Sequence, residues 1–231
     1  MTPPARPSAE AVGAVVFDAY GTLFDVNAAA ATLAPEIGPE AAALAELWRR
    51  KQLEYSWLRT LMGRHSDFWQ VTADALDFAM EKLRLPIGVR PRLLELYFRL
   101  PPFADARPLL ERCRRQGLKL AILSNGAPEM LNAAITHAGL TEFFDAVLSV
   151  EAVGLFKPRP EVYRLAVEHL GVPASRTVFV SANGWDVAGA AAFGFAAVWI
   201  NRAGEPLERL PALPIAIVAS LAELPQAVAL D

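Results

Sequence analysis

The chain has 231 residues, of which 54% are hydrophobic and 20% charged, and 22 basic against 25 acidic residues give a net charge of −3. This composition excludes a largely disordered chain and argues against a dedicated nucleic-acid binder. The one cysteine, Cys113, excludes an internal disulfide. It lies in RCRRQG inside an expected helix, where we expect a structural role, although the neighbouring arginines would modestly lower its pKa. The three histidines, at positions 65, 137 and 169, are far apart and lack the spacing of metal ligands.

The opening segment MTPPARPSAEAVG has no uninterrupted apolar run of the kind that a secretory signal needs. No stretch of the chain approaches the ~20 apolar residues that cross a bilayer. We therefore expect neither a membrane partner nor a nucleic-acid partner, and a cytoplasmic location.

The first expected strand is Ala11–Asp18, an apolar run that ends in an acidic residue. Residues 28–100 then contain no convincing strand, and their apolar residues recur every three or four positions, as amphipathic helices require. This spacing is carried by Leu44, Leu47, Trp48, Tyr55, Leu58 and Met62, by Phe68, Val71, Ala75, Phe78 and Ala79, and by Val89, Leu93, Leu96 and Leu100. We interpret 28–100 as a helical cap domain inserted into a core domain made of 1–27 and 101–231.

Strands and helices alternate after Pro101-Pro102. The expected strands are Leu118–Ser124, Thr177–Ala182, Ala196–Ile200 and Ile215–Val218. Helices are expected over Ala104–Gln116, closed by Gly117, and from Pro160 to Leu170, closed by Gly171. Runs that are apolar on both faces and separated by helices indicate a parallel sheet covered on two sides. The predicted fold class is α/β, with a doubly wound, Rossmann-like parallel sheet and an inserted helical cap.

Polar residues follow three of the expected strands. They are Asp18, the pair Ser124 and Asn125, and the group Ser181, Asn183 and Asp186. Lys157 lies in the loop GLFKPRP just before a helix, which places it at the same edge of the sheet. Ligands of an open parallel sheet bind beyond the carboxyl ends of its strands, near the point where strand order reverses. We therefore expect these polar residues to meet in one crevice.

Asp18 is the candidate nucleophile. A carboxylate at the end of a buried strand is costly unless it is paired or used, although an aspartate there is commonly a turn former. The surrounding segment FDAYGTLFD favours a nucleophile, because a positioned and ionised carboxylate can act as a covalent catalyst. Lys157 would keep Asp18 ionised, since a nearby cation favours the charged form.

The segments FDAYGTLFD, SNG, KPRPEVY and SANGWD resemble the four motifs of the haloacid dehalogenase superfamily. LWRRKQLEYSWLRTLMGR followed by DFW is similar to the helical cap of the L-2-haloacid dehalogenases in that superfamily, and the resemblance runs from Ala14 to Asn201. It implies hydrolytic dehalogenation of short-chain L-2-haloalkanoic acids to D-2-hydroxy acids. Asp18 would displace the halide from C2 and form an ester, which water would then hydrolyse. The implied partners are the small 2-haloacid and water.

The same resemblance implies roles for further residues. The implied catalytic set is Asp18, Thr22, Arg49, Ser124, Lys157, Tyr163, Ser181, Asn183 and Asp186. The implied substrate-binding set is Tyr20, Arg49, Leu53, Phe68, Ser124, Asn125 and Trp185. Arg49 would assist the departing halide and Ser124 would bind the substrate carboxylate. The residue that activates the hydrolytic water stays open among Asp186, Asn183 and Lys157.

Phosphatases of the superfamily carry a second aspartate two positions after the nucleophile, where this chain has Tyr20. That acid protonates an alkoxide leaving group, and a halide needs no proton, so we expect no cofactor and no metal. Three alternatives remain: a phosphatase, a hydrolase of another activated carbon–heteroatom bond, and a catalytically silent relative that binds a carboxylate or a protein.

The chain departs from the family pattern at a few positions. Arg50 stands where glutamine is common, Phe156 where tyrosine is frequent, and Ala182 and Gly184 replace a serine and an alanine. These changes leave the preferred halogen and chain length open. The apolar cap helices and the dimers typical of relatives predict a homodimer.

Overall fold

A computed structural model describes residues 12–230. Its centre is a six-stranded sheet in which every pairing is parallel, in the order β3-β2-β1-β4-β5-β6. The strands are β1 Ala14–Phe17, β2 Lys119–Ser124, β3 Ala146–Ser149, β4 Thr177–Ser181, β5 Ala196–Ile200 and β6 Ala216–Val218. Strand order reverses between β1 and β4, which confirms the predicted doubly wound α/β class.

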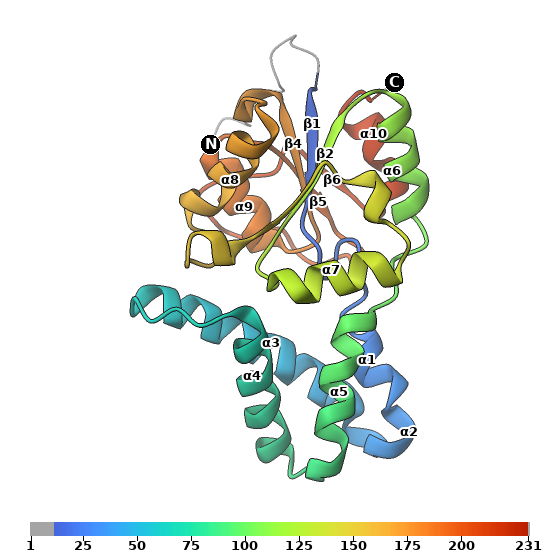
Figure 1. The fold of residues 1–231 in the computed structure, drawn as a ribbon, viewed down its shortest axis with the longest axis vertical. Helices are drawn as coiled ribbons and strands as arrows, with labels where there is room; N and C mark the ends of the chain where they lie inside the picture. Colours follow the sequence, from blue (N-terminus) through green and yellow to red (C-terminus); the bar gives the residue numbers. More distant parts are fainter. Residues whose placement is uncertain (1–11, 231) are drawn as a thin grey trace.

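Helices cover both faces of the sheet (Figure 1). Helices α8 (Pro160–Leu170) and α9 (Gly184–Phe193) pack on one face, and α6 (Ala106–Arg115) and α10 (Leu224–Ala227) lie on the other. Helix α7 (Pro128–His137) packs against β3. All four residues of β1 are fully buried, which explains why that strand is a continuous apolar run instead of an alternating one.

Residues 28–100 contain helices and no strand, as the spacing of their apolar residues predicts. The α-helices are α1 Ala28–Thr32, α2 Ala34–Ile37, α3 Ala41–Leu61, α4 Phe68–Leu83 and α5 Arg90–Leu96. Figure 1 shows this helical insert at the end of the sheet toward which β1 runs. The insert therefore faces the edge where the predicted site residues lie.

The two long insert helices, α3 and α4, pack against each other, and the two halves of α3 differ in how far they are buried. Helix α4 begins at an N-cap, Asp67, whose side chain accepts a hydrogen bond from the backbone N–H of Gln70. In α3 the buried apolar residues lie in its first half, whereas Leu58 and Met62 are 43% and 64% exposed. The regular apolar spacing of α3 thus continues beyond the part of the helix that the fold covers.

Most predicted boundaries agree with the structure, and one strand was missed. β5 and α8 match their predicted ranges, and β2, β4 and β6 are each one residue shorter than expected. Ala11, the first residue of the expected first strand, lies outside the described residues. The missed strand is β3, an edge strand of four residues, AVLS, which is too short to show a periodicity of its own.

Cys113 is buried, which agrees with a structural role, but its pKa shifts in the direction opposite to the expected one. The residue lies in α6 and is fully buried. Burial raises the pKa of its thiol to about 11, and the opposing effect of Arg112 is smaller. The prediction of a lowered pKa was therefore wrong, because helical periodicity turns Cys113 toward the core and leaves desolvation in control.

Candidate active site

The predicted polar residues meet at the carboxyl edge of the sheet, around the reversal of strand order. Asp18 follows β1, Ser124 ends β2, and Ser181 ends β4. Lys157 lies between β3 and α8, so the missed strand is the one that leads into its loop. The predicted convergence is confirmed by the hydrogen bonds described below.

Lys157 joins two carboxylates that are far apart in the sequence. Its Nζ donates to Asp18 Oδ1 at 3.1 Å and to Asp186 Oδ2 at 2.8 Å. All three residues are at least 95% buried, so water solvates their charges poorly. Each carboxylate therefore depends on the Lys157 ammonium for stabilisation, and the ammonium depends on the carboxylates. The backbone N–H of Lys157 donates to Asn125 Oδ1 at 3.0 Å, which fixes the loop beside β2.

Burial and charge act against each other in this cluster. Burial lowers the pKa of Lys157, but Asp18 and Asp186 together raise it above its ordinary value, so the ammonium keeps its proton. Burial also raises the pKa of Asp186 to about 6, and the negative charge of Asp18 acts in the same direction. The protons of such a cluster belong to the group as a whole.

Tyr163 supports the second carboxylate. Its hydroxyl donates to Asp186 Oδ1 at 2.8 Å, and burial raises the pKa of the phenol well above its usual value, so it stays a donor. A side chain at Gly189 would place its Cβ 2.5 Å from the Tyr163 hydroxyl. Glycine is therefore required where α9 passes the tyrosine.

The other oxygen of Asp18 is bound by residues around the end of β4. Asp18 Oδ2 accepts from Asn183 Nδ2 at 2.9 Å and from Thr22 Oγ1 at 3.4 Å. Thr22 Oγ1 in turn accepts from the backbone N–H of Ala182 at 2.8 Å, and Ser181 Oγ accepts from the backbone N–H of Asn183 at 3.1 Å. Ala182 contacts Thr22 through its backbone N–H, so this hydrogen bond does not depend on which side chain stands at position 182.

The segment Ser124-Asn125-Gly126 combines turn formation with site placement. Ser124 is fully buried, and its Oγ accepts from the backbone N–H of Gly126 at 3.1 Å. A Cβ at Gly126 would lie 2.7 Å from the ring of Tyr20. The close approach of this backbone to Tyr20 requires glycine and narrows the space above β2.

Arg49 reaches the site from the insert. Its Nη2 donates to Asn183 Oδ1 at 3.3 Å, and its Nη1 donates to Gln52 Oε1 at 2.7 Å. Gln52 Nε2 donates to Thr72 Oγ1 at 2.7 Å, and both Gln52 and Thr72 are fully buried. Buried hydrogen bonds from Thr72 on α4 through Gln52 thus orient the Arg49 guanidinium. The guanidinium in turn bonds Asn183, which donates to Asp18.

Sequence reasoning missed Gln52 and Thr72. Glutamine and threonine on helices are mostly exposed, so nothing in their local sequence marks them as buried. The available signal was the position of Gln52, three residues after Arg49 and on the same helical face.

The predicted apolar residues line the same region. The rings of Tyr20 and Phe68 stack with centroids 6.1 Å apart, and both side chains are buried. Burial raises the pKa of Tyr20, so its phenol stays neutral. Trp185 is half-buried and meets the ring of Trp57 edge-on at 5.3 Å, and Leu53 is half-buried on α3.

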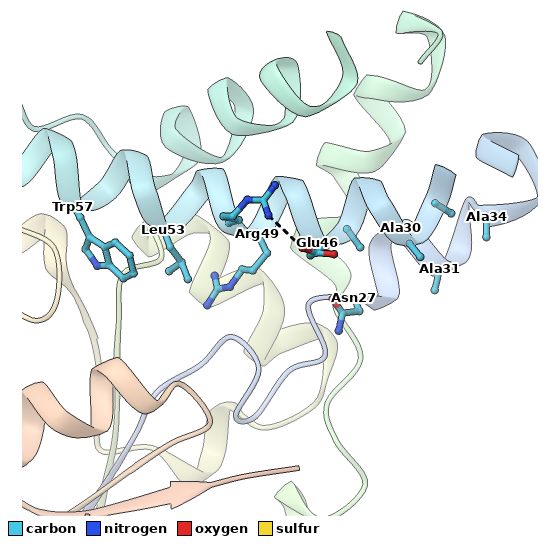
Figure 2. A pocket seen from close by; sticks show the side chains of 12 residues that line it. Asn27, Ala30, Ala31, Ala34, Glu46, Arg49, Leu53 and Trp57 are labelled. Atoms are coloured by element: carbon cyan, nitrogen blue, oxygen red, sulfur yellow. Dashed lines mark hydrogen bonds and ion pairs between the residues drawn. The ribbon is translucent and has the colours of Figure 1, made fainter. Parts of the chain in front are cut away.

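A groove of about 860 Å³ runs beside this region (Figure 2). Alanines of α1, α2 and α3 form much of its wall, and Arg49, Leu53 and Trp57 line it as well. Figure 2 shows Leu53 and Trp57 pointing from α3 toward the core. Arg50 is exposed and pairs with Glu46 at 3.3 Å at the outer side of the groove. Arg49 therefore lines this groove and also bonds Asn183, which in turn donates to Asp18.

Within residues 12–230, no cluster of three or more His, Cys, Asp or Glu side chains is arranged to hold a metal ion. No helix in that range is long and apolar enough to cross a membrane.

Comparison with known proteins gives one consistent family. The family model of the haloacid dehalogenase-like hydrolases matches residues 12–194. The (S)-2-haloacid dehalogenase 1 of Pseudomonas sp. (strain CBS-3) is 48% identical over 217 residues, which are 93% of this chain and 96% of that protein. The (S)-2-haloacid dehalogenase of Pseudomonas sp. (strain YL) is 45% identical over 90% of each chain.

A solved structure agrees with these relatives. It is the L-2-haloacid dehalogenase of Xanthobacter autotrophicus with chloropropionic acid covalently bound. It superposes with a TM-score of 0.88 at 40% identity and covers 94% of this chain and 98% of that one.

The chain therefore belongs to the haloacid dehalogenase-like hydrolases. Within this family the relatives described above are (S)-2-haloacid dehalogenases, which are hydrolases that act on carbon–halide bonds. The resemblance inferred from the four motifs and the insert is confirmed.

Proposed function

We propose that this enzyme hydrolyses short-chain L-2-haloalkanoic acids to D-2-hydroxy acids through an ester on Asp18. The observation that carries the proposal is the Asp18 carboxylate at the end of β1, held 3.1 Å from the Lys157 ammonium in a buried site. A buried carboxylate beside a cation is poorly hydrated and held in position, which suits a nucleophile. The names of the relatives supply the substrate class.

In the first step, one Asp18 carboxylate oxygen attacks C2 of the substrate and the carbon–halogen bond breaks. The halide leaves with the bonding electron pair, so no proton is required. Arg49, bonded to Asn183 Oδ1, brings a positive charge to the developing halide. Ser124 at the end of β2 would bind the substrate carboxylate, and Asn125 beside it would line the halide side of the site. In-line attack inverts C2, so an L-haloacid gives a D-hydroxy acid.

In the second step, water adds to the carbonyl carbon of the Asp18 ester. Asp186 is our choice for the group that accepts the proton of this water, because burial raises its pKa to about 6 and Tyr163 fixes its orientation. Collapse of the tetrahedral intermediate expels the hydroxy acid, and the proton returns to it from Asp186. The oxygen of the water remains in the Asp18 carboxyl group, whose remaining proton is released to solvent as the carboxylate is regenerated.

We also propose that neither step needs a metal ion. Lys157 bonds Asp18 Oδ1, and Asn183 Nδ2 bonds both Asp18 Oδ2 and, at 3.3 Å, the Tyr20 carbonyl oxygen. Oxygens that could ligate a cation are thus engaged by nitrogen donors. Tyr20 also replaces the carboxylate that would protonate an alkoxide, which disfavours the phosphatase alternative.

The insert, residues 28–100, would act as a cap over the site, with the core formed by 1–27 and 101–231. We propose that the groove beside Arg49 is the route by which substrate enters.

A homodimer is also proposed, because Leu61 and Met62 at the end of α3 are 82% and 64% exposed and would be covered by a second copy. Sedimentation velocity of the wild type and Leu61→Glu tests the dimer, which the variant should weaken. We also propose a cytoplasmic location, which suits a chain with a single cysteine.

Substrate assays separate the candidate functions. L-2-chloropropionate, D-2-chloropropionate and p-nitrophenyl phosphate are incubated with the enzyme, with and without EDTA, and released halide and phosphate are measured. We expect halide from the L substrate alone, unaffected by EDTA. Magnesium-dependent phosphate release would establish the phosphatase instead. Release of neither product would leave a hydrolase of another electrophile or a silent binder.

Isotope labelling tests the ester. A single turnover in H₂¹⁸O should place the label in the carboxyl group of Asp18, detected by mass spectrometry of the peptide that contains it. Asp18→Asn should abolish turnover, and Asp25→Asn, at an aspartate outside the cluster, serves as control. Label that enters the product directly would overturn the covalent scheme.

A further inference from the structure

The tip of the α3–α4 hairpin is fastened to the loop that carries Lys157. His65 Nε2 lies 2.7 Å from Glu151 Oε2, and Glu151 Oε1 accepts from the backbone N–H of Phe68 at 3.0 Å. Thr60 Oγ1 accepts from the backbone N–H of Phe156 at 3.1 Å. We call these five residues the clasp, because they join the insert to the core.

Glu151 is anchored in the core and reaches out to the insert. It lies in the short helical turn that follows β3, Val150–Ala152. Its backbone N–H donates to Ser149 Oγ at 3.2 Å, and Ser149 Oγ donates to the Gly126 carbonyl at 2.7 Å. The Glu151 carboxylate therefore has a fixed base next to the Ser124-Asn125-Gly126 turn, and both of its oxygens bond residues of the insert.

The clasp borders two parts of the catalytic site. Phe156 directly precedes Lys157, is fully buried, and has its ring 4.9 Å from His65 and 6.0 Å from Phe68. Phe68 stacks on Tyr20, the residue whose carbonyl accepts from Asn183. A movement of the hairpin tip would thus disturb the backbone beside Lys157 and the apolar wall together.

The exposure of the His65 and Glu151 side chains indicates whether their charges or their hydrogen-bond geometry contributes more. The side chains of His65 and Glu151 are 25% and 20% exposed, so water screens their attraction and the charges contribute little by themselves. The geometric constraint is stronger, because one carboxylate accepts two donors from the insert while Thr60 accepts a third hydrogen bond from the core.

We propose that Glu151 is a positioning residue that holds the α3–α4 hairpin closed against the Lys157 loop during turnover. The proposal rests on the proposed function, since closure is read out as dehalogenation of L-2-haloacids. Glu151 touches no reacting atom, and it acts through Phe68 and Phe156. Closure by such contacts excludes water and completes a site formed from two parts of a chain.

Three variants test the proposal. Glu151→Ala removes both hydrogen bonds and should lower kcat/KM for L-2-chloropropionate about 5–20-fold, mostly through KM, because the closed state becomes less populated. Glu151→Gln keeps an acceptor for the Phe68 N–H and a polar group for His65, and should restore most of kcat/KM. Glu36→Ala breaks the exposed Glu36–Arg92 pair, which lies within the insert, and should leave kcat/KM unchanged.

Hydrogen–deuterium exchange provides a readout that needs no substrate. Glu151→Ala should speed amide exchange in 60–68 and also in 150–157, whereas Glu36→Ala should change neither segment. Faster exchange confined to 65–68, with wild-type KM, would show that Glu151 merely caps α4 and would overturn the proposal. Coupled exchange in an enzyme that releases no halide would instead overturn the proposed function and leave the clasp intact.

Discussion

The core half and the insert half of the site are built in different ways. In the core half, the buried Lys157 ammonium donates directly to both buried carboxylates, Asp18 and Asp186. In the insert half, Arg49, Leu53 and Trp57 are half-buried beside an open groove, and Arg49 is oriented by a separate chain through Gln52. The charges that perform the chemistry are therefore preorganised, whereas the residues that would meet the substrate depend on how the insert is held.

This difference separates two kinds of defect. A change in the core half leaves a buried charge without its partner, which costs both stability and catalysis. A change in the insert half alters orientation or access while the fold survives. Four predictions test this division, and the first two compare activity with stability.

The largest effect is expected for Lys157→Met. It leaves two buried carboxylates side by side, so we expect turnover to fall by at least about 10³-fold and the free energy of unfolding to drop by about 3–5 kcal/mol at pH 8. Without the ammonium, burial and the charge of Asp18 raise the pKa of Asp186 unopposed by Lys157, so the variant should gain stability as the pH falls from 8 to 5.

Urea unfolding at several pH values, together with halide release, measures this. Lys82→Met, at an exposed lysine of α4, is the control. A variant that is stable at pH 8 but inactive would mean that the carboxylates do not depend on Lys157 for their burial.

Gln52→Leu should affect activity more than stability. Leucine fills the buried position but cannot accept the 2.7 Å hydrogen bond from Arg49, so the guanidinium loses its fixed direction. We expect kcat/KM to fall on the order of 10- to 100-fold, because small displacements of a catalytic group are costly. Gln70→Leu, on the exposed side of α4, should be neutral. Wild-type kinetics with a lowered melting temperature would assign Gln52 a purely structural role.

The pH profile tests the core half without a mutation. Asp186 must be ionised to take a proton from water, and its pKa is raised to about 6. Below that pH, kcat should therefore fall about tenfold per unit. Tyr163→Phe removes a hydrogen bond that favours the ionised form, so the acidic limb should move to higher pH. A kcat that stays constant from pH 5 to 8 would argue against Asp186 as the proton acceptor.

The smallest effect is expected in the groove. Ala45→Leu narrows its wall and should lower kcat/KM for 2-chlorobutanoate about 2–5-fold relative to 2-chloropropionate. Ala43→Leu, at an exposed alanine of α3 outside the groove, is the matched control. Equal losses for both substrates would show that the groove is not the entry route.

The sequence determined much of this protein on its own. Apolar runs that end in Asp18, Ser124 and Ser181 gave the strands of a parallel sheet, and parallel strands necessarily bring their carboxyl ends to one edge. Helical spacing in 28–100 gave the insert, and the motif residues gave the carboxylate cluster. These features are local in the sequence, so a reading of the sequence can find them.

Other features depended on contacts between distant segments. Strand β3 is recognisable as a strand because it pairs with β2. Gln52 is buried because α4 covers it, and Cys113 has a raised pKa because its helix turns it inward. Glu151 and His65 are 86 positions apart, and no local pattern links them. Burial and pairing are properties of the packed chain, so only the tertiary structure could decide which polar side chains support the site.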